Sequence, residues 1–169
     1  MSGATASEPW HDAKVPAAHC PRWPRGRAGA PGSLVGTEEG RVPRGAAMST
    51  IHVALNRAMR VEGALGATLV DYVSRMPLGA LSHRTDLDLS RAAHGCTDVV
   101  RAHLSALNLT GYKPEQMEDI LVTFVGELHL IRPLTRRTHE GLFLLLVLDR
   151  ERAHPDLARK ELRCVEDLL

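Results

Sequence analysis

The feature that most constrains the fold is an uninterrupted run of seven apolar residues, Leu142–Leu148 (LFLLLVL). A strand with one face in water alternates apolar and polar residues, whereas a strand covered on both faces is apolar throughout. The run is also far shorter than the roughly 20 residues that cross a bilayer. We therefore predict that it is the central strand of a sheet covered on both faces, and we expect no membrane insertion.

Two further apolar runs precede it, Asp119–Val125 and Leu128–Leu134, separated by Gly126 and Glu127. This spacing is typical of a β-hairpin. Neither run alternates cleanly, because Ile120–Val122 is continuously apolar, and this again favours a sheet covered on both faces.

Another pair of strands is predicted nearer the N-terminus, at Ala64–Asp71 and Arg75–His83, joined by a turn at Asp71–Ser74. The second of these strands contains Pro77 and Gly79. Proline lacks a backbone N–H and is tolerated mainly at the edge of a sheet, so we expect this strand at an edge.

Three helices complete the predicted order of helix, two strands, helix, three strands and helix. The first is expected to begin at Met48, with Ser49 or Thr50 as its N-cap, and to end at Glu62-Gly63. The last is expected at Pro155–Leu169, with proline at its first position. Hairpin-linked strands make the sheet antiparallel, and helices on both faces give a three-layer α-β-α sandwich of the α+β class.

The long helix, predicted over Thr85–Asn108 with Asp86 or Asp88 as its cap, carries two stripes at helical spacing. The large apolar stripe suits docking on a sheet and consists of Leu89, Ala93, Cys96, Val100, Leu104 and Leu107. The second stripe contains mainly small residues and consists of Ala92, Gly95, Val99, Ala102 and Ala106. We interpret it as a contact face for another helix. The alternative is that alanine occupies solvent-facing positions because it favours helix.

Residues 1–47 differ in composition from the rest of the chain. They hold six of the ten prolines and seven of the fourteen glycines, with arginines between them and no sustained apolar periodicity. Such a segment buries too little surface to offset its ordering entropy, and we predict a disordered tail before a domain at 48–169. A second hypothesis is that Met48 is the true initiator.

Composition and motifs exclude several classes of function. The net charge of +1 comes from interspersed signs, which does not favour nucleic acid as a partner. His94, Cys96 and His103 do not share ligand spacing on one helix face, and the chain has no phosphate loop or nucleophile motif. We therefore expect no catalytic, cofactor-binding or metal-binding residues. The absence of an apolar N-terminal leader, and an odd number of separated cysteines, lead us to expect a cytoplasmic protein.

Four segments together resemble the Roadblock/LC7 domain family, most closely its small stand-alone bacterial members of actinobacterial type. They are EGALGATLVDY (Glu62–Tyr72), LDLSRAAHGCTDVVRAHL (Leu87–Leu104), MEDILVTFVGELHLIRPL (Met117–Leu134) and GLFLLLVLDRERA (Gly141–Ala153). The resemblance covers about residues 49–169. One departure is the turn at Asp71–Ser74, where relatives usually have an Asp-Gly turn.

The resemblance implies a five-stranded antiparallel sheet of order 2-1-5-4-3, with the long helix on one face and the two terminal helices on the other. It also implies a homodimer in which the third strand pairs with its symmetry mate and the long helices lie beside each other. The pairing strand here would be Asp119, Ile120, Leu121, Val122 and Thr123. The small-residue stripe of the long helix would be the helix contact. An exposed apolar edge strand would otherwise be an aggregation hazard.

The resemblance further implies a function without catalysis. Family members act as regulatory or scaffolding subunits in signalling, often for small Ras-like GTPases, including bacterial gliding and polarity GTPases. A competing hypothesis is a small-ligand sensory domain of profilin-like or PAS-like architecture. That function needs a hollow core with a few inward polar groups. The predicted strands are filled with Leu, Val, Ile and Phe, which disfavours it.

Overall fold

A computed structural model of the chain describes residues 44–134 and 139–169. Most of the predicted tail therefore lies outside the described residues. The elements are, in chain order, α1 (Arg44–Ala58), β1 (Ala64–Asp71), β2 (Met76–Ser82), α2 (Leu89–Thr110), the 3₁₀ turn η1 (Pro114–Gln116), β3 (Ile120–Thr123), β4 (Glu127–Pro133), β5 (Leu142–Asp149) and α3 (Pro155–Glu166). None of the described helices combines the length and the apolar character that a membrane crossing needs.

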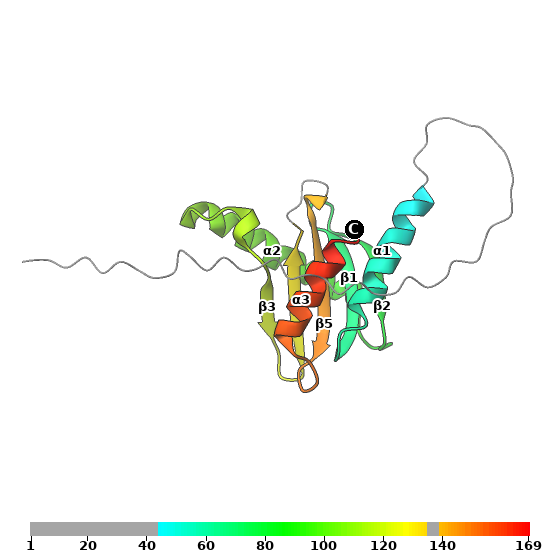
Figure 1. Ribbon diagram of the computed structural model, residues 1–169. Coiled ribbons are helices and arrows are strands. Elements are labelled where there is room, and N and C mark those ends of the chain that lie inside the picture. Colours follow the sequence, from blue (N-terminus) through cyan, green and yellow to red (C-terminus); the bar gives the residue numbers. More distant parts are fainter. Residues whose placement is uncertain (1–43, 135–138) are drawn as a thin grey trace, which may run out of the picture. The chain divides into compact units, whose positions relative to one another are not determined.

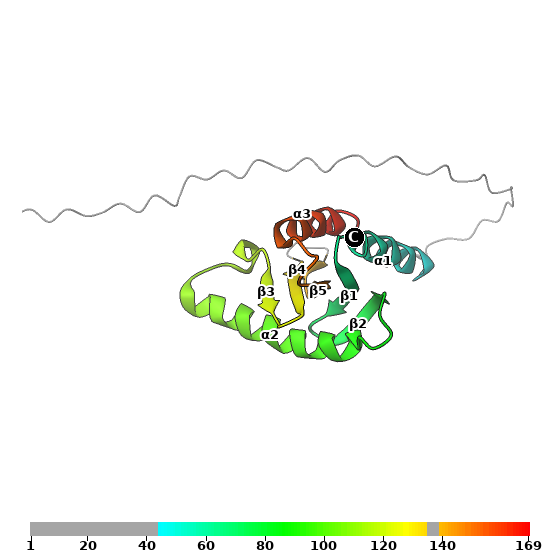
Figure 2. The same ribbon diagram turned by 90° about the horizontal axis from the view of Figure 1, so that it is seen from below.

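The five strands form one antiparallel sheet in the order β2-β1-β5-β4-β3 (Figure 1). β5 is central, as the apolar run predicts, and Phe143–Leu148 is fully buried. Helix α2 covers one face of the sheet, while α1 and α3 lie side by side on the other (Figure 2). The predicted three-layer architecture and strand order are thus confirmed.

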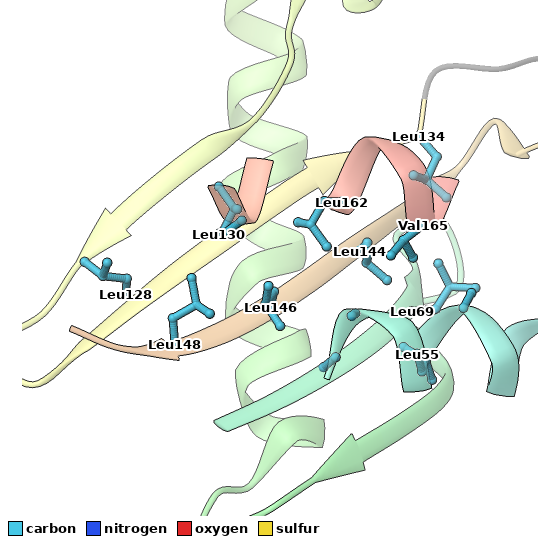
Figure 3. Close-up of a cluster of buried hydrophobic side chains, with 14 residues drawn as sticks. Leu55, Leu69, Leu128, Leu130, Leu134, Leu144, Leu146, Leu148, Leu162 and Val165 are labelled. Carbon is cyan, nitrogen blue, oxygen red and sulfur yellow. The ribbon is translucent and has the colours of Figure 1, made fainter. Parts of the chain in front are cut away.

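Each face of the sheet has its own apolar core, because alternate residues of β5 point to opposite sides. Leu144, Leu146 and Leu148 pack with residues of α1 and α3, and Figure 3 shows this cluster between the sheet and the two helices. Phe143, Leu145 and Val147 belong to the opposite cluster, with the buried side chains of α2. The central strand therefore links both cores.

The β2 edge has the features predicted for it. Pro77 lies opposite Val70 at a register shift in the β1–β2 pairing, so the missing donor falls at an irregularity of an edge strand. The preceding turn closes without glycine. Its Asp71 carboxylate accepts hydrogen bonds from the backbone N–H groups of Val73 and Ser74, at 2.8 and 3.2 Å, and from the Ser74 hydroxyl at 2.8 Å.

The prediction for the start of the first helix is wrong. Helix α1 begins at Arg44 rather than Met48, and Ser49 and Thr50 lie inside it instead of capping it. Ala46 and Ala47 are strong helix formers that extend the helix toward the N-terminus. The helix also ends earlier than predicted, at Ala58.

Helix α2 is shifted toward the C-terminus relative to the prediction. Of the two predicted caps, Asp88 is confirmed, because its carboxylate accepts a hydrogen bond of 2.9 Å from the backbone N–H of Arg91. The helix extends to Thr110, where Gly111 adopts a left-handed conformation with φ of 78°. A left-handed glycine is a common helix end.

The third strand is shorter than its apolar sequence predicts. It covers Ile120–Thr123, and the turn falls at Phe124–Gly126 instead of Gly126-Glu127. The backbone N–H of Phe124 donates to the carbonyl of Glu127 at 2.8 Å. Arg150, after β5, donates from its backbone to the Gly126 carbonyl and from its guanidinium to the Phe124 carbonyl, both at 3.1 Å. These bonds give the backbone groups of Phe124 and Gly126 hydrogen-bond partners without a neighbouring strand.

We expect Leu146→Ala to lower the free energy of unfolding by about 2–5 kcal/mol, because it opens a cavity beside the central strand. Urea denaturation measures the change. Leu157→Ala, at a position 54% exposed on α3, is the matched control and should change the free energy by less than about 0.5 kcal/mol. Equal effects of the two variants would contradict the assignment of the core.

Candidate interaction surface

The free side of β3 is the first part of the candidate surface. Within 44–134 and 139–169, β3 pairs with β4 on one side and with no strand on the other. Ile120, Leu121 and Val122 are half-buried and Thr123 is exposed. The strand thus presents backbone hydrogen-bonding groups at an edge whose side chains are largely apolar, and such an edge is a template for pairing with another strand.

The exposed flank of α2 is the second part. Gly95, Val99, Ala102 and Ala106 are exposed and face away from their own sheet. Ala92, also in the predicted stripe, is half-buried and packs against the core on the α2 face. A Cβ atom placed on Gly95 would meet nothing within 4 Å. The other stripe docks on the sheet as predicted at Leu89, Ala93, Cys96 and Val100, which are buried together with Thr97.

Helix α2 is longer than the sheet is wide. It has 22 residues and is therefore about 33 Å long, whereas five strands span about 19 Å across the sheet. It crosses the strands and its second half extends past β3 (Figure 2). None of its residues from Arg101 to Thr110 is buried, and Leu109 is 89% exposed. Within this half, Leu104 still packs against the core on the α2 face and Leu107 is half-buried, while the other residues are exposed.

Ion pairs hold the beginning of β3 against α3. The Arg159 Nε donates to both carboxylate oxygens of Asp119, at 2.9 and 3.1 Å. Arg132 of β4 pairs with Glu166 of α3 at 2.9 Å, and both side chains are largely buried. Arg132 also donates to the carbonyl of Glu118 at 3.2 Å. Asp119, predicted as the first residue of the pairing strand, lies one residue before β3, and its carboxylate is bound by Arg159 of the same chain.

A polar cluster supports the tip of the β3–β4 hairpin. The ring of Phe124 packs on that of His129, with centroids 4.7 Å apart. The His129 Nε2 lies 3.6 Å from a carboxylate oxygen of Glu127, and Arg84 pairs with the other oxygen at 2.9 Å. Burial lowers the pKa of His129 below its ordinary value of 6.5, and Glu127 opposes this shift. The strand pattern did not predict this cluster, because its members come from separate segments.

A hollow lies at the other end of β3, where α2 connects to the strand. Its volume is about 420 Å³. Its lining includes side chains from α2, from the connection and from α3, namely His103, Leu107, Tyr112, Met117, Glu118 and Arg159. The hollow therefore joins the overhanging half of α2 to the beginning of β3.

The described residues offer little for chemical catalysis. No three or more of their His, Cys, Asp and Glu side chains come together as metal ligands. Burial raises the pKa of the Cys96 thiol to about 11, so it is protonated at neutral pH and a poor nucleophile. The His94 Nδ1 lies 2.8 Å from the carbonyl of Ser90 on its own helix.

We expect the free energy of unfolding to rise with pH as it approaches 6.5. Because the pKa of His129 is lowered in the folded chain, the unfolded chain binds more protons between that lowered pKa and 6.5. His129→Gln should remove this part of the slope. Chemical denaturation of both proteins between pH 4.5 and 7.5 measures it, and parallel pH profiles would contradict the assignment.

Comparison with known proteins bears on the fold. No protein-family model matches the chain, and no curated protein sequence matches it. Among solved structures, MglB of Myxococcus xanthus superposes with a TM-score of 0.61 at 16% identity, covering 80% of this chain and 90% of that one. The gliding protein MglB of Thermus thermophilus gives 0.57 at 18% identity, over 79% and 100%. A Roadblock/LC7 domain from Streptomyces avermitilis gives 0.55 at 13% identity, over 70% and 90%. The chain therefore has the Roadblock/LC7 fold.

Proposed function

We propose that the protein is a non-catalytic homodimeric module that regulates or scaffolds a small Ras-like GTPase or another signalling protein. The observation that carries this proposal is the unpaired β3 edge beside the exposed small-residue flank of α2. The fold is shared with MglB, which is described as a gliding protein and of which one solved structure has a tetrameric arrangement. These likenesses support self-association and a role in signalling.

In the proposed dimer, one twofold axis gives the free edge of β3 a partner strand and covers the half of α2 that extends past β3. Antiparallel pairing of Ile120–Thr123 with its copy gives the free backbone groups of β3 their partners and makes one continuous sheet. The half of α2 that extends past β3 would then lie beneath the strands of the second copy. Small side chains at Gly95, Ala102 and Ala106 let the two helices approach closely.

The domain predicted at 48–169 after the tail 1–47 remains a proposal, and the first turn of α1 (Arg44–Ala58) reaches back into the tail segment. The proposed role is one of binding, which the free β3 edge and the exposed flank of α2 support, and the described side chains hold no metal-ligand cluster. A regulator of this kind acts through different affinities for two states of its partner. A GTPase partner requires a compartment that contains GTP, so the proposal places the module in the cytoplasm.

We expect the chain to be a dimer at micromolar concentration, and we expect Gly95→Glu to weaken it at least about tenfold, because a carboxylate would be buried at the helix contact. Light scattering with size exclusion measures both. Gly95 has open space around it, so the monomer should fold with either residue.

Ser105→Glu is the matched control, since Ser105 is exposed on the polar flank of the same helix and should leave dimerisation unchanged. A monomeric parent chain, or a Gly95→Glu variant that dimerises as the parent does, would contradict the dimer.

We expect the chain to bind a bacterial Ras-like GTPase with at least about tenfold different affinity in the GTP-bound and GDP-bound states, because regulation requires differential binding. Calorimetric titration of the purified chain into each loaded GTPase of the same organism measures this. Equal affinity for both states, or no binding to any of these GTPases, would argue against GTPase regulation.

A further inference from the structure

We propose that the twofold axis of the dimer passes at Val122, so that this residue lies directly opposite its own copy and sets the register in which the two β3 strands pair. The inference rests on the proposed function, because it needs β3 to pair with a second copy. It adds which backbone groups of the two copies meet and which side chains lie on the axis.

The hydrogen bonds of the β3–β4 hairpin determine which backbone groups of β3 point to the free side. The backbone N–H of Phe124 donates to the Glu127 carbonyl at 2.8 Å, so it points toward β4. Successive residues of a strand direct their backbone groups to opposite sides, and β3 pairs with β4 residue by residue without a register shift. The backbone groups of Val122 therefore point toward β4, whereas those of Leu121 and Thr123 point to the free side.

Symmetry restricts how this edge can pair with a copy of itself. In an antiparallel pair, two residues that lie opposite each other direct their backbone groups either both toward the partner strand or both away from it. Two copies of one strand meet this condition only when opposite residues are an even number of positions apart. One residue then lies opposite its own copy on the twofold axis. Within β3 the axis can therefore pass only at one of the four residues Ile120–Thr123.

An axis at Val122 gives every outward backbone group of β3 a partner within the strand. Leu121 then lies opposite Thr123 of the second copy, and Thr123 lies opposite Leu121 of the second copy. Each of these two pairs exchanges two hydrogen bonds. Val122 and its copy exchange none, because the backbone groups of both point toward β4 of their own chains.

The other three positions of the axis leave outward groups of β3 without a partner strand. An axis at Ile120 or Leu121 would bring a residue of β3 opposite Asp119, which precedes the strand and whose carboxylate is bound by an arginine of α3. An axis at Thr123 would place Leu121 opposite Val125, which lies in the turn. Neither Asp119 nor Val125 belongs to a strand, so these registers form fewer hydrogen bonds than an axis at Val122.

The side chains at the axis suit this register. Val122 packs on the α2 side of the sheet and Leu121 on the side of α1 and α3, and both are half-buried. Opposite residues that exchange no hydrogen bonds have the closest Cα atoms, about 4.5 Å apart, so their side chains are in contact. In the dimer, each copy of Val122 would cover the exposed part of the other, while Leu121 would pack beside Thr123 of the second copy.

Single cysteine substitutions along β3 test the register directly. Val122→Cys should give a disulfide-linked dimer under mild oxidation, because its two copies would lie about 4.5 Å apart, and a disulfide needs a Cα separation below about 7 Å. Leu121→Cys and Thr123→Cys are the matched controls, since their own copies would be displaced by two residues and lie about 8 Å apart. The two copies of Ile120→Cys would be about 14 Å apart. The parent chain accounts for its own cysteines, at positions 20, 96 and 164.

Complementary charges at the same position provide a second, independent measurement. Val122→Asp and Val122→Lys each place like charges opposite each other, and each alone should raise the dimer dissociation constant at least about tenfold. An equal mixture of the two should associate at least about fivefold more tightly than either alone, because opposite charges then meet. Thr123→Asp mixed with Thr123→Lys is the matched control and should gain less than about twofold, since these residues lie opposite Leu121. A cooperative unfolding transition of each variant verifies that it folds.

The outcomes separate the register from the dimer on which it rests. Cross-linking at Val122 alone, together with tighter association of the mixed charge variants, supports the register. If the parent dimerises and Gly95→Glu disrupts it, but a different position cross-links, none does, or mixing brings no gain, the register is overturned and the dimer stands. A parent chain that is monomeric throughout overturns both.

Discussion

The structure depends on the burial of β5 from both sides. Leu144–Leu148 has no solvent exposure, and its alternate side chains enter two separate cores. A strand of this kind is stable only when helices cover both faces of its sheet, which requires α2 on one side and α1 with α3 on the other. The same strand pairs with β1 and β4, so the two hairpins of the fold meet along it.

The two edges of this sheet differ physically, and the proposed function depends on this difference. At the β2 edge, Pro77 removes a donor and α1 packs so closely that a Cβ on Gly79 would lie 2.9 Å from Ile51. At the β3 edge, no strand of the described residues pairs with the free side, and half of α2 extends beyond the strand. In the proposed dimer, a second copy continues the sheet at this edge.

Most of the fold could be predicted from sequence, because its signals are local. The bounds of β1 are those that its apolar run and turn residues predict, and the spacing in α2 separates the docked stripe from the exposed one. The start of α1 was missed because alanines extend the helix past a plausible cap. The end of β3 was missed because Phe124 and Val125 continue its apolar run while Arg150 closes the turn. The hollow joins His103 to Arg159, a proximity that no local pattern encodes.

Amide hydrogen exchange of Ile120–Thr123 as a function of protein concentration tests the central claim most directly. The account predicts that the outward N–H groups of β3 exchange quickly in dilute solution and become protected as the concentration passes the dissociation constant of the dimer, while the amides of β5 stay protected throughout. Fast exchange of the β3 amides at every concentration, in a protein that remains folded, would contradict it.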